Sequence, residues 1–455
     1  MSLTLGPAGS STPTESFVAR LDRVPLNRFH WRLLVTSGVG WMFAAMDIAL
    51  IAFLLVPIGR DLSLNAARTS AVATAALIGM IIGALVAGRL ADRYGRQRLF
   101  WATLVVFSVG ALLSAAAPTF ETLLAARFIA GLGLGGELPV ATTLLAEFAP
   151  RAQRGRLIVL LDSFWIFGAL LAGLIAVALV PSYGWRVAFA VAAIPALYAA
   201  YLRSGLPESP RFLAERGRAA DADAIVRRVE RASGGALLTL GRAVAPARAA
   251  SSALTSVLGR GYARHTAMLW LLAFAIVLTV YATFDFVASL RFARGLADVR
   301  TTQFFFASTL ALVPAYLAAA WLVERLGRKA TLILFLLAAG LFAVLFGRAG
   351  GSTAPYVYAA LMLAFSAGAW GICYAYATEL YPTSVRGTGA GLTAAVGRIG
   401  AIAGPFLIAM LGPAVSRTGI YAVLVAVPVL AALAIFALGD ETRGRSIEDT
   451  ARASM

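Results

Sequence analysis

The most regular feature of this chain is the alternation of long apolar segments with short polar ones. A helix needs roughly 20 apolar residues to cross the hydrocarbon of a bilayer, and segments of about this length recur throughout. We expect six spans in the first half, near 31–57, 67–90, 97–117, 121–147, 157–180 and 185–202. Six more are expected near 266–290, 302–323, 330–347, 355–378, 388–412 and 418–438. The pattern therefore predicts an all-α membrane protein with twelve transmembrane helices.

The polar stretches divide the chain into five parts. We expect a cytoplasmic N-terminal segment at 1–30, helical halves at 31–203 and 266–438, a cytoplasmic linker at 204–265 and a cytoplasmic tail at 439–455. Residues 1–30 lack the apolar core of a cleavable signal peptide. In the linker, residues 218–231 have helical spacing, with apolar side chains on one side.

The two halves share two charged motifs at a single sequence offset. Asp-Arg-Tyr-Gly-Arg at 92–96 matches Glu-Arg-Leu-Gly-Arg at 324–328, and Glu-x-x-Pro-x-x-x-Arg-Gly at 147–155 matches the same pattern at 379–387. Both offsets are 232 residues, which indicates an internal duplication. In so apolar a chain, this predicts a transporter built from two like halves.

Charged motifs cannot lie in hydrocarbon, so we place them in loops at the membrane surface. Their glycines allow tight turns, and their arginines favour the cytoplasmic side. We expect these charges to hold one conformation closed and to separate in another; the alternative is a pair of solvated turns that only set topology. The candidate gating residues are Asp92, Arg93, Arg96, Glu147, Arg154, Glu324, Arg325, Arg328, Glu379 and Arg386.

Composition supports the membrane assignment. Of the 455 residues, 60% are hydrophobic and only 13% are charged, which leaves too little polar surface for a soluble protein. The net charge of +17 would suggest nucleic-acid binding in a soluble protein. Here the arginines lie in short loops between spans, so they indicate positive-inside topology and no nucleic-acid partner.

The loop motifs resemble those of a known superfamily. The segment GRLADRYGRQ at 88–97 resembles the loop signature of the major facilitator superfamily, and the repeated Glu-x-x-Pro-x-x-x-Arg-Gly fits the same superfamily. The resemblance implies two pseudo-symmetric six-helix bundles with a central substrate cavity. The chain has no Gly-x-x-x-x-Gly-Lys loop, so transport energy must come from an ion gradient or from the substrate gradient.

An ionisable residue deep in a span is costly unless it is paired or faces water. Asp47 is centred in the first span, and Arg127 in the fourth span is its expected partner. We predict that Asp47 carries a proton and that Arg127 gates it; a static buried ion pair is the alternative. His30 and His265 lie at helix ends, so proton coupling must use carboxylates.

A second set of polar and aromatic residues falls within the spans. Acids, an arginine and flat aromatic faces around one axis suit a small aromatic molecule that bears a charge. The candidates are Glu137, Asp162, Trp165, Tyr281, Asp285, Trp370, Tyr374 and Arg398. The aromatic residues could instead serve packing. Arg398 could bind a substrate carboxylate through its planar fork or form a structural bridge with Asp285 or Asp162.

Side-chain amides, which suit the vicinal hydroxyls of sugars, are scarce. The chain has only Asn27, Asn65, Gln97, Gln153 and Gln303, and none is mid-span. A sugar porter is therefore disfavoured, although PESPRFL at 207–213 and ETRGRSIE at 441–448 look like sugar-porter motifs.

A closer resemblance covers most of the chain. The segments RLDRVPLNRFHWRLL, AMDIALIAF, GLGLGGELPVATTLLAEFAP, LLDSFW, ATELYPTSVRGTGAG and GRIGAIAGP together look like the bacterial niacin permeases, which are near the aromatic-acid:proton symporters. The resemblance implies uptake of nicotinate or nicotinamide across the inner membrane. Asp47 and Arg127 match the coupling pair of proton-linked relatives, and Arg398 matches an arginine of organic anion carriers. Asp285 departs from the permeases, which tend to have tryptophan and proline there.

We therefore expect a monomeric importer of a nicotinate-like aromatic acid, coupled to protons, in the bacterial inner membrane with both termini cytoplasmic. Its expected partners are the small-molecule substrate, protons and membrane lipid. The alternatives are efflux of aromatic or cationic drugs, or symport of another aromatic acid. A receptor would need a signalling domain that neither tail can hold. We expect no cofactor, no metal and no enzymatic activity, because convergent His, Cys or metal-ligand spacing is absent and Cys373 is the sole cysteine.

Overall fold

Long helices account for nearly all of the structure. A computed structural model describes residues 17–233, 257–259, 261–292, 299–349, 353–414 and 417–445. Within these residues, twelve helices are long and apolar enough to cross a membrane, and no strand is present. The prediction of an all-α membrane protein with twelve spans is confirmed, because each predicted span overlaps one of these helices.

The first half contains six of these spans. Two of them are interrupted: the fifth span is formed by α6 and α7, and the sixth by α8 and α9. The helices are α2 (Arg28–Asp61), α3 (Ala66–Tyr94), α4 (Arg96–Ala115), α5 (Phe120–Phe148), α6 (Arg154–Asp162), α7 (Phe164–Ala178), α8 (Val180–Ala192) and α9 (Pro195–Gly205).

The second half repeats the pattern with six helices, each of which forms a span without interruption. They are α13 (Ala263–Phe292), α14 (Val299–Arg325), α15 (Arg328–Arg348), α16 (Ala354–Leu380), α17 (Arg386–Ala414), preceded by the short 3-10 helix η1 (Thr383–Val385), and α18 (Arg417–Leu438).

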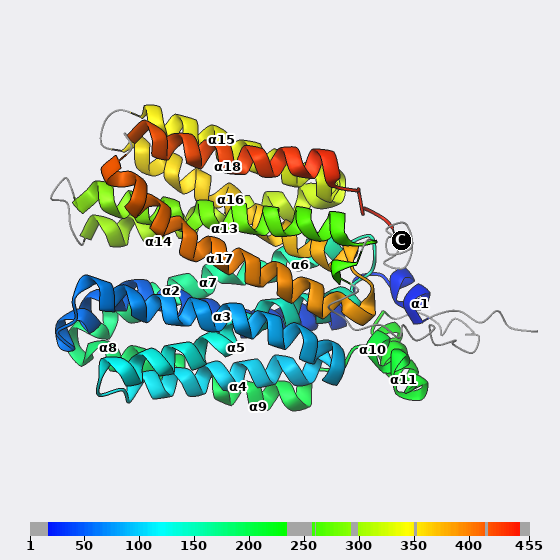
Figure 1. Cartoon of the computed structure of the whole chain (residues 1–455). Coiled ribbons are helices and arrows are strands. Elements are labelled where there is room, and N and C mark those ends of the chain that lie inside the picture. The colour runs from blue at the N-terminus through cyan, green and yellow to red at the C-terminus, as the bar shows by residue number, and fades with distance from the viewer. Residues whose placement is uncertain are drawn as a thin grey trace, which may run out of the picture.

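The two halves form two bundles that lie side by side. Figure 1 shows α2 to α9 in one layer and α13 to α18 in the other, with all long helices roughly parallel or antiparallel. The bundles meet where α3 packs on α17 and where α6 packs on α14 and α16. Side chains that α6 and α14 direct toward each other therefore lie between the bundles.

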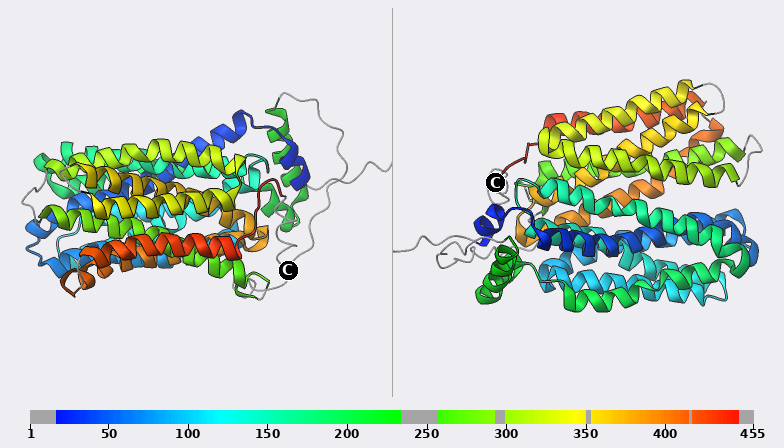
Figure 2. Two further views of the ribbon diagram at one scale, coloured as in Figure 1. Left: turned by 90° about the horizontal axis from the view of Figure 1, so that it is seen from above. Right: turned by 180° about the vertical axis from the view of Figure 1, so that it is seen from behind.

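Three short helices gather at one end of the molecule. They are α1 (Phe17–Arg23), α10 (Pro210–Glu215) and α11 (Ala219–Arg231), and Figure 2 shows them beyond the ends of the long helices. The predicted apolar side of α11 is buried through Ala222, Val226 and Val229. Because the charged motifs at 92–96 and 324–328 lie at this same end, we call it the basic end.

The outer surface of the bundles is apolar. Large side chains such as Leu197, Phe406 and Phe436 are 77%, 64% and 70% exposed. Such surface is unfavourable in water, whereas lipid chains solvate it readily. The chain is thus a multi-pass membrane protein.

The two charged motifs turn as expected. Gly95 and Gly327 have φ angles of 108° and 92°, a region that side chains rarely adopt. Each glycine lies between two helices and directly precedes the second one. A distant glutamate accepts hydrogen bonds from the first two backbone N–H groups of that second helix. Glu208 accepts from Arg96 at 2.9 Å, and Glu441 accepts from Arg328 at 2.9 Å. These acids belong to the sugar-porter-like segments noted in the sequence.

Candidate functional site

Asp47 and Arg127 form a buried ion pair inside the first bundle. Arg127 Nη1 donates to Asp47 Oδ1 at 3.2 Å, and Nη2 donates to Oδ2 at 2.6 Å. The guanidinium lies 4.8 Å from the ring centroid of Phe189, and both charged side chains are at most 1% exposed. The structure thus brings together the two residues predicted to couple protons. Burial makes the bidentate contact strong and makes loss of either partner costly.

Asp162 lies at the interface between the bundles. Tyr316 of α14 donates its hydroxyl to Asp162 Oδ2 at 2.9 Å, and Trp41 donates to the Asp162 carbonyl oxygen at 3.3 Å. The other carboxylate oxygen is buried without a hydrogen-bond partner in the described structure. Gly371 of α16 packs close to the other oxygen, because a Cβ there would lie 3.3 Å from Asp162 Oδ2. Asp162 can therefore accept a further donor.

Arg398 faces aromatic residues of the second bundle. Its guanidinium lies 5.8 Å from the ring centroid of Trp370, which packs edge to face on Tyr374 at 4.9 Å. Arg398 is within Coulombic range of Asp162 and Tyr281 but makes no ion pair among the described residues. Its Nε and the Tyr374 hydroxyl are buried and unpartnered there. We call Asp162, Tyr316, Trp370, Tyr374 and Arg398 the central cluster.

The other predicted substrate residues lie around or away from this cluster. Trp165 packs against Trp41 with ring centroids 5.9 Å apart. Glu137 lies inside the first bundle, where Thr103 donates to its carboxylate at 2.6 Å and a Cβ on Gly40 would lie 2.9 Å from its free oxygen. The side chain of Asp285 lies outside the described residues.

At the basic end, charged side chains of the repeated motifs join the two bundles. We call them the charge network: Asp92, Arg96, Glu147, Glu324, Arg328, Glu379 and Arg386. Asp92 accepts hydrogen bonds from the backbone N–H groups of Gly387 and Thr388 at 3.1 and 2.8 Å, at the N-terminus of α17. The helix dipole favours a carboxylate at that position. Arg386 donates to Glu147 at 2.8 Å, and Arg96 lies between Asp92 and Glu147 at 3.0 and 3.1 Å. These contacts close the basic end in this conformation.

The second motif repeats these contacts with the bundles exchanged. Glu324 accepts from the backbone N–H of Arg156 at 2.9 Å, as Asp92 does from Thr388, and Arg328 pairs with Glu324 and Glu379. Arg156 and Thr388 differ by the same 232 positions as the motifs. The duplication inferred from sequence therefore extends to the contacts.

The repeat is not exact. Arg154, the counterpart of Arg386, pairs with Asp22 at 2.9 Å instead of reaching Glu379. Arg93 and Arg325 lie outside the network: Arg93 is 5.3 Å from the Tyr94 ring centroid and Arg325 is 4.3 Å from that of Trp321. Sequence reasoning missed Asp22 and Thr388, because their partners are set by packing between distant segments.

Two glycines near this network bring the bundles into close backbone contact. A Cβ on Gly88 of α3 would collide with the carbonyl oxygen of Gly387, and one on Gly387 would lie 2.7 Å from that of Gly88. We expect Gly88→Ala to destabilise the closed basic end and to accelerate amide hydrogen exchange at residues 386–391. Gly340→Ala, whose Cβ would lie 3.3 Å from the Val429 side chain and 3.8 Å from the Val425 carbonyl oxygen, is the matched control. Equal exchange in the two variants would contradict this role.

Glu215 of α10 is a further acid beside the network. Burial raises its pKa from an ordinary 4.5 to about 7, and nearby Arg96 opposes the shift. The folded protein thus keeps this proton at pH values where the unfolded chain has lost it, so stability falls as pH rises from 4.5 to about 7. We expect the melting temperature of Glu215→Gln to fall less over this range. Glu121→Gln, at an exposed position, should behave like the original protein; an unaltered pH profile in Glu215→Gln would refute the assignment.

Comparison with known families identifies the architecture. The family described as sugar (and other) transporter matches residues 33–453. The chain belongs to this family. It is a family of the major facilitator superfamily, so the resemblance drawn from the loop motifs is confirmed.

Two bacterial transporters resemble the chain over nearly its full length. The niacin transporter NiaP of Acinetobacter baylyi is 39% identical over 95% of this chain and 98% of that protein. The putative niacin/nicotinamide transporter NiaP of Bacillus subtilis is 37% identical over 92% of this chain and 98% of that protein. The predicted similarity to niacin permeases is confirmed.

Among solved structures, the proton:xylose symporter XylE bound to 6-bromo-6-deoxy-D-glucose has a TM-score of 0.73. It is 20% identical and the match covers 94% of this chain and 99% of that chain. This likeness shows the fold. It does not favour a sugar, because the two asparagines of this chain cap helices: Asn27 accepts from Phe29 and Asn65 accepts from Arg68, both at 2.9 Å.

Proposed function

We propose that this protein is a secondary transporter that imports nicotinate, or a closely related aromatic carboxylate, across the bacterial inner membrane together with a proton. The observation that carries the proposal is Arg398, which is only 7% exposed and has a buried Nε without a partner in the described structure. A planar guanidinium beside the Trp370 ring suits a flat molecule with a carboxylate, because it can bind the carboxylate while the ring stacks nearby. The names of the relatives agree with such a substrate.

The distribution of positive charge supports one orientation of the protein in the membrane. Positive loops stay on the cytoplasmic side, and we assign the basic end, with its arginine-rich motifs, to that side. Both termini are then cytoplasmic, and residues 204–265 form a cytoplasmic linker. At the opposite end the bundles meet through Phe53 and Phe305, whose ring centroids are 4.7 Å apart. Separation of the charge network would open the cavity to the cytoplasm, and separation of these two rings would open it to the other side. Alternation between the two states would give alternating access.

Proton coupling is assigned to Asp47 and Arg127. A buried carboxylate can release or bind a proton when its cation moves away, because desolvation and a nearby charge act on its ionisation in opposite directions. We propose that the transporter acts as a monomer without a cofactor and without enzymatic activity.

A second candidate function rests on a different observation. Asp162 and Glu137 each have a buried carboxylate oxygen without a partner, and neither forms an ion pair in the described structure. Two unpaired acids suit a cation, so proton-coupled efflux of aromatic or cationic drugs is the alternative.

Competition distinguishes the two functions. Uptake of labelled nicotinate by the purified protein in proteoliposomes should be inhibited by excess benzoate, because it shares the ring and the carboxylate. Glucose and tetraphenylphosphonium should leave uptake unchanged. Inhibition by tetraphenylphosphonium alone would favour the cation transporter, and inhibition by glucose would reverse the substrate assignment.

A further inference from the structure

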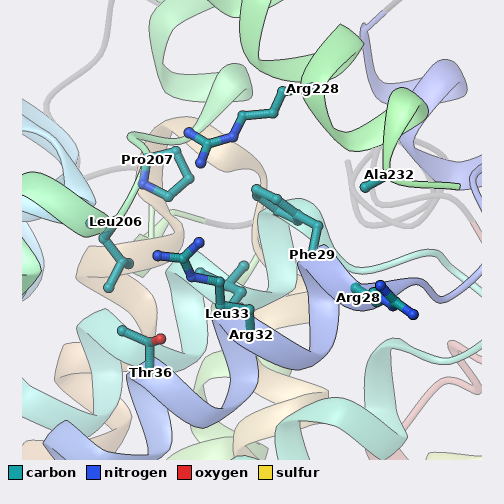
Figure 3. Close-up of a pocket in the computed structure, with 10 residues that line it drawn as sticks. Arg28, Phe29, Arg32, Leu33, Thr36, Leu206, Pro207, Arg228 and Ala232 are labelled. Carbon is teal, nitrogen blue, oxygen red and sulfur yellow. The ribbon is translucent and has the colours of Figure 1, made fainter.

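A pocket lies at the basic end, away from the central cluster and from the charge network. It has a volume of about 210 Å³ and is bounded by α2, by the segment that follows α9 and by α11. Its apolar walls are Phe29 and Leu33 of α2 and Leu206 and Pro207 of the segment that follows α9. Three arginines line it, and Arg28 lies apart from Arg32 and Arg228 (Figure 3).

The two arginines converge from different helices. Figure 3 shows the guanidinium groups of Arg32, from α2, and Arg228, from α11, both directed toward Pro207. Neither forms an ion pair within the described residues; Arg32 makes only a 3.4 Å contact to the Tyr201 hydroxyl. Two like charges that face one another repel, so an anion between them would be stabilised by both.

The acids of α11 are already engaged elsewhere. Asp221 pairs with Arg218 at 2.7 Å, Asp223 pairs with Arg227 at 2.7 Å, and Glu230 pairs with Arg20 at 2.9 Å. These pairs leave Arg228 without a carboxylate from its own helix. The positive charge of the pocket is therefore available to an external ligand.

The position of the pocket favours a lipid over a free anion. It lies where the first span begins, and its floor reaches Thr36, inside that span. Next to it along α2, Trp31 and Val35 are 41% and 50% exposed, and Tyr201 of α9 is 47% exposed. Aromatic side chains of this kind are enriched at the membrane–water interface. A headgroup in the pocket would thus leave its acyl chains beside apolar surface.

We propose that this pocket binds the phosphate of an anionic phospholipid such as phosphatidylglycerol. Basic pockets beside membrane helices on the cytoplasmic side recognise such headgroups. The phosphate would bridge Arg32 and Arg228 and fasten α11 to the first bundle. It would add to the existing contact in which Asn27 donates to the Val229 carbonyl at 3.0 Å.

Native mass spectrometry of the full-length delipidated protein tests the proposal. The protein is titrated with dioleoylphosphatidylglycerol and, separately, with dioleoylphosphatidylcholine. We expect phosphatidylglycerol to bind more tightly, and the double variant Arg32→Gln/Arg228→Gln to weaken it on the order of fivefold per arginine. The control, Arg151→Gln/Arg445→Gln, removes two exposed arginines of the same end and should bind as the unmodified protein does.

Folding and ligand source are checked in the same experiment. Melting temperature without lipid reports folding, and Arg228→Gln alone, at an exposed position, serves if the double variant is unstable. Inorganic phosphate and glycerol 3-phosphate should neither bind measurably nor displace the lipid. Equal phosphatidylglycerol affinity in the double variant and its control overturns the proposal. Displacement of the lipid by inorganic phosphate at comparable concentration would overturn the lipid assignment and identify the ligand as a free anion.

Discussion

Replacing Arg398 by glutamine is expected to raise the KM for nicotinate uptake by about 10- to 100-fold. A hydrogen bond to a charged group contributes about 1.5–3 kcal/mol, and glutamine can replace neither the charge nor the planar fork. The effect should be large because Arg398 is buried and has a free Nε within the described structure. Initial rates in proteoliposomes over a range of nicotinate concentrations provide the measurement.

Two further variants separate binding from general damage. Arg398→Lys keeps the charge but loses the two-point geometry, so its KM should lie between those of the original protein and Arg398→Gln. Arg348→Gln, at an exposed position at the end of α15, should leave KM unchanged. An unaltered KM in Arg398→Gln would remove the carboxylate-binding role and leave Arg398 as a packing element beside Trp370.

Replacing Asp47 by asparagine is expected to abolish accumulation of nicotinate driven by a pH gradient, while exchange of labelled for unlabelled nicotinate continues. Asparagine retains the shape of the side chain but cannot carry the proton. Net uptake against a concentration gradient requires proton movement, whereas exchange needs only the loaded carrier to change conformation. The measurement compares the two assays on the same proteoliposomes.

Asp47→Asn also removes the buried ion-pair partner of Arg127. Leaving Arg127 buried and unpaired costs about 3–5 kcal/mol, which could reduce the amount of folded protein. The double variant Asp47→Asn/Arg127→Gln removes both charges and restores neutrality, so it should fold and still exchange without accumulating. Arg186→Gln, which disrupts the solvent-exposed pair with Asp61, is the control. Accumulation that persists in Asp47→Asn would leave the Asp47–Arg127 pair as a static link between helices.

The spans could be predicted because their cause is local. Each needs only a sufficient run of apolar residues, and an isolated charge such as Asp47 within such a run already requires a partner. The breaks were not predicted. Ser163 separates α6 from α7, and Ala193 and Ile194 separate α8 from α9. The kink at Gly184, which has a φ of 76°, lies instead in the gap that we expected between the fifth and sixth spans.

Contacts between the bundles were predictable only in part. The common offset relates Asp92 to Glu324, and the structure brings both to equivalent helix N-termini in the opposite bundle. The partner of Asp162 could not be found in this way. Tyr316 lies in an apolar span with no charged neighbour, and only the packing of α14 against α6 places its hydroxyl 2.9 Å from the carboxylate.

Glu208 and Glu441 lie in segments that could be recognised from the sequence, although their structural role could not. Their segments stood out in the sequence, but their role could not be read from it, because the helix N-termini that they cap lie more than a hundred residues away. Helix capping by an acid from a distant segment depends on the closed arrangement of the bundle. Sequence periodicity carries no information about it.

The central claim is that a proton gradient drives an aromatic carboxylate through this molecule. It is tested most directly by uptake of labelled nicotinate into proteoliposomes that contain the purified protein, with the outside made more acidic than the inside. The account predicts accumulation above the external concentration and its collapse to equilibration when a protonophore removes the gradient. Uptake that reaches the same level with and without the gradient, or no uptake of nicotinate at all, would contradict it.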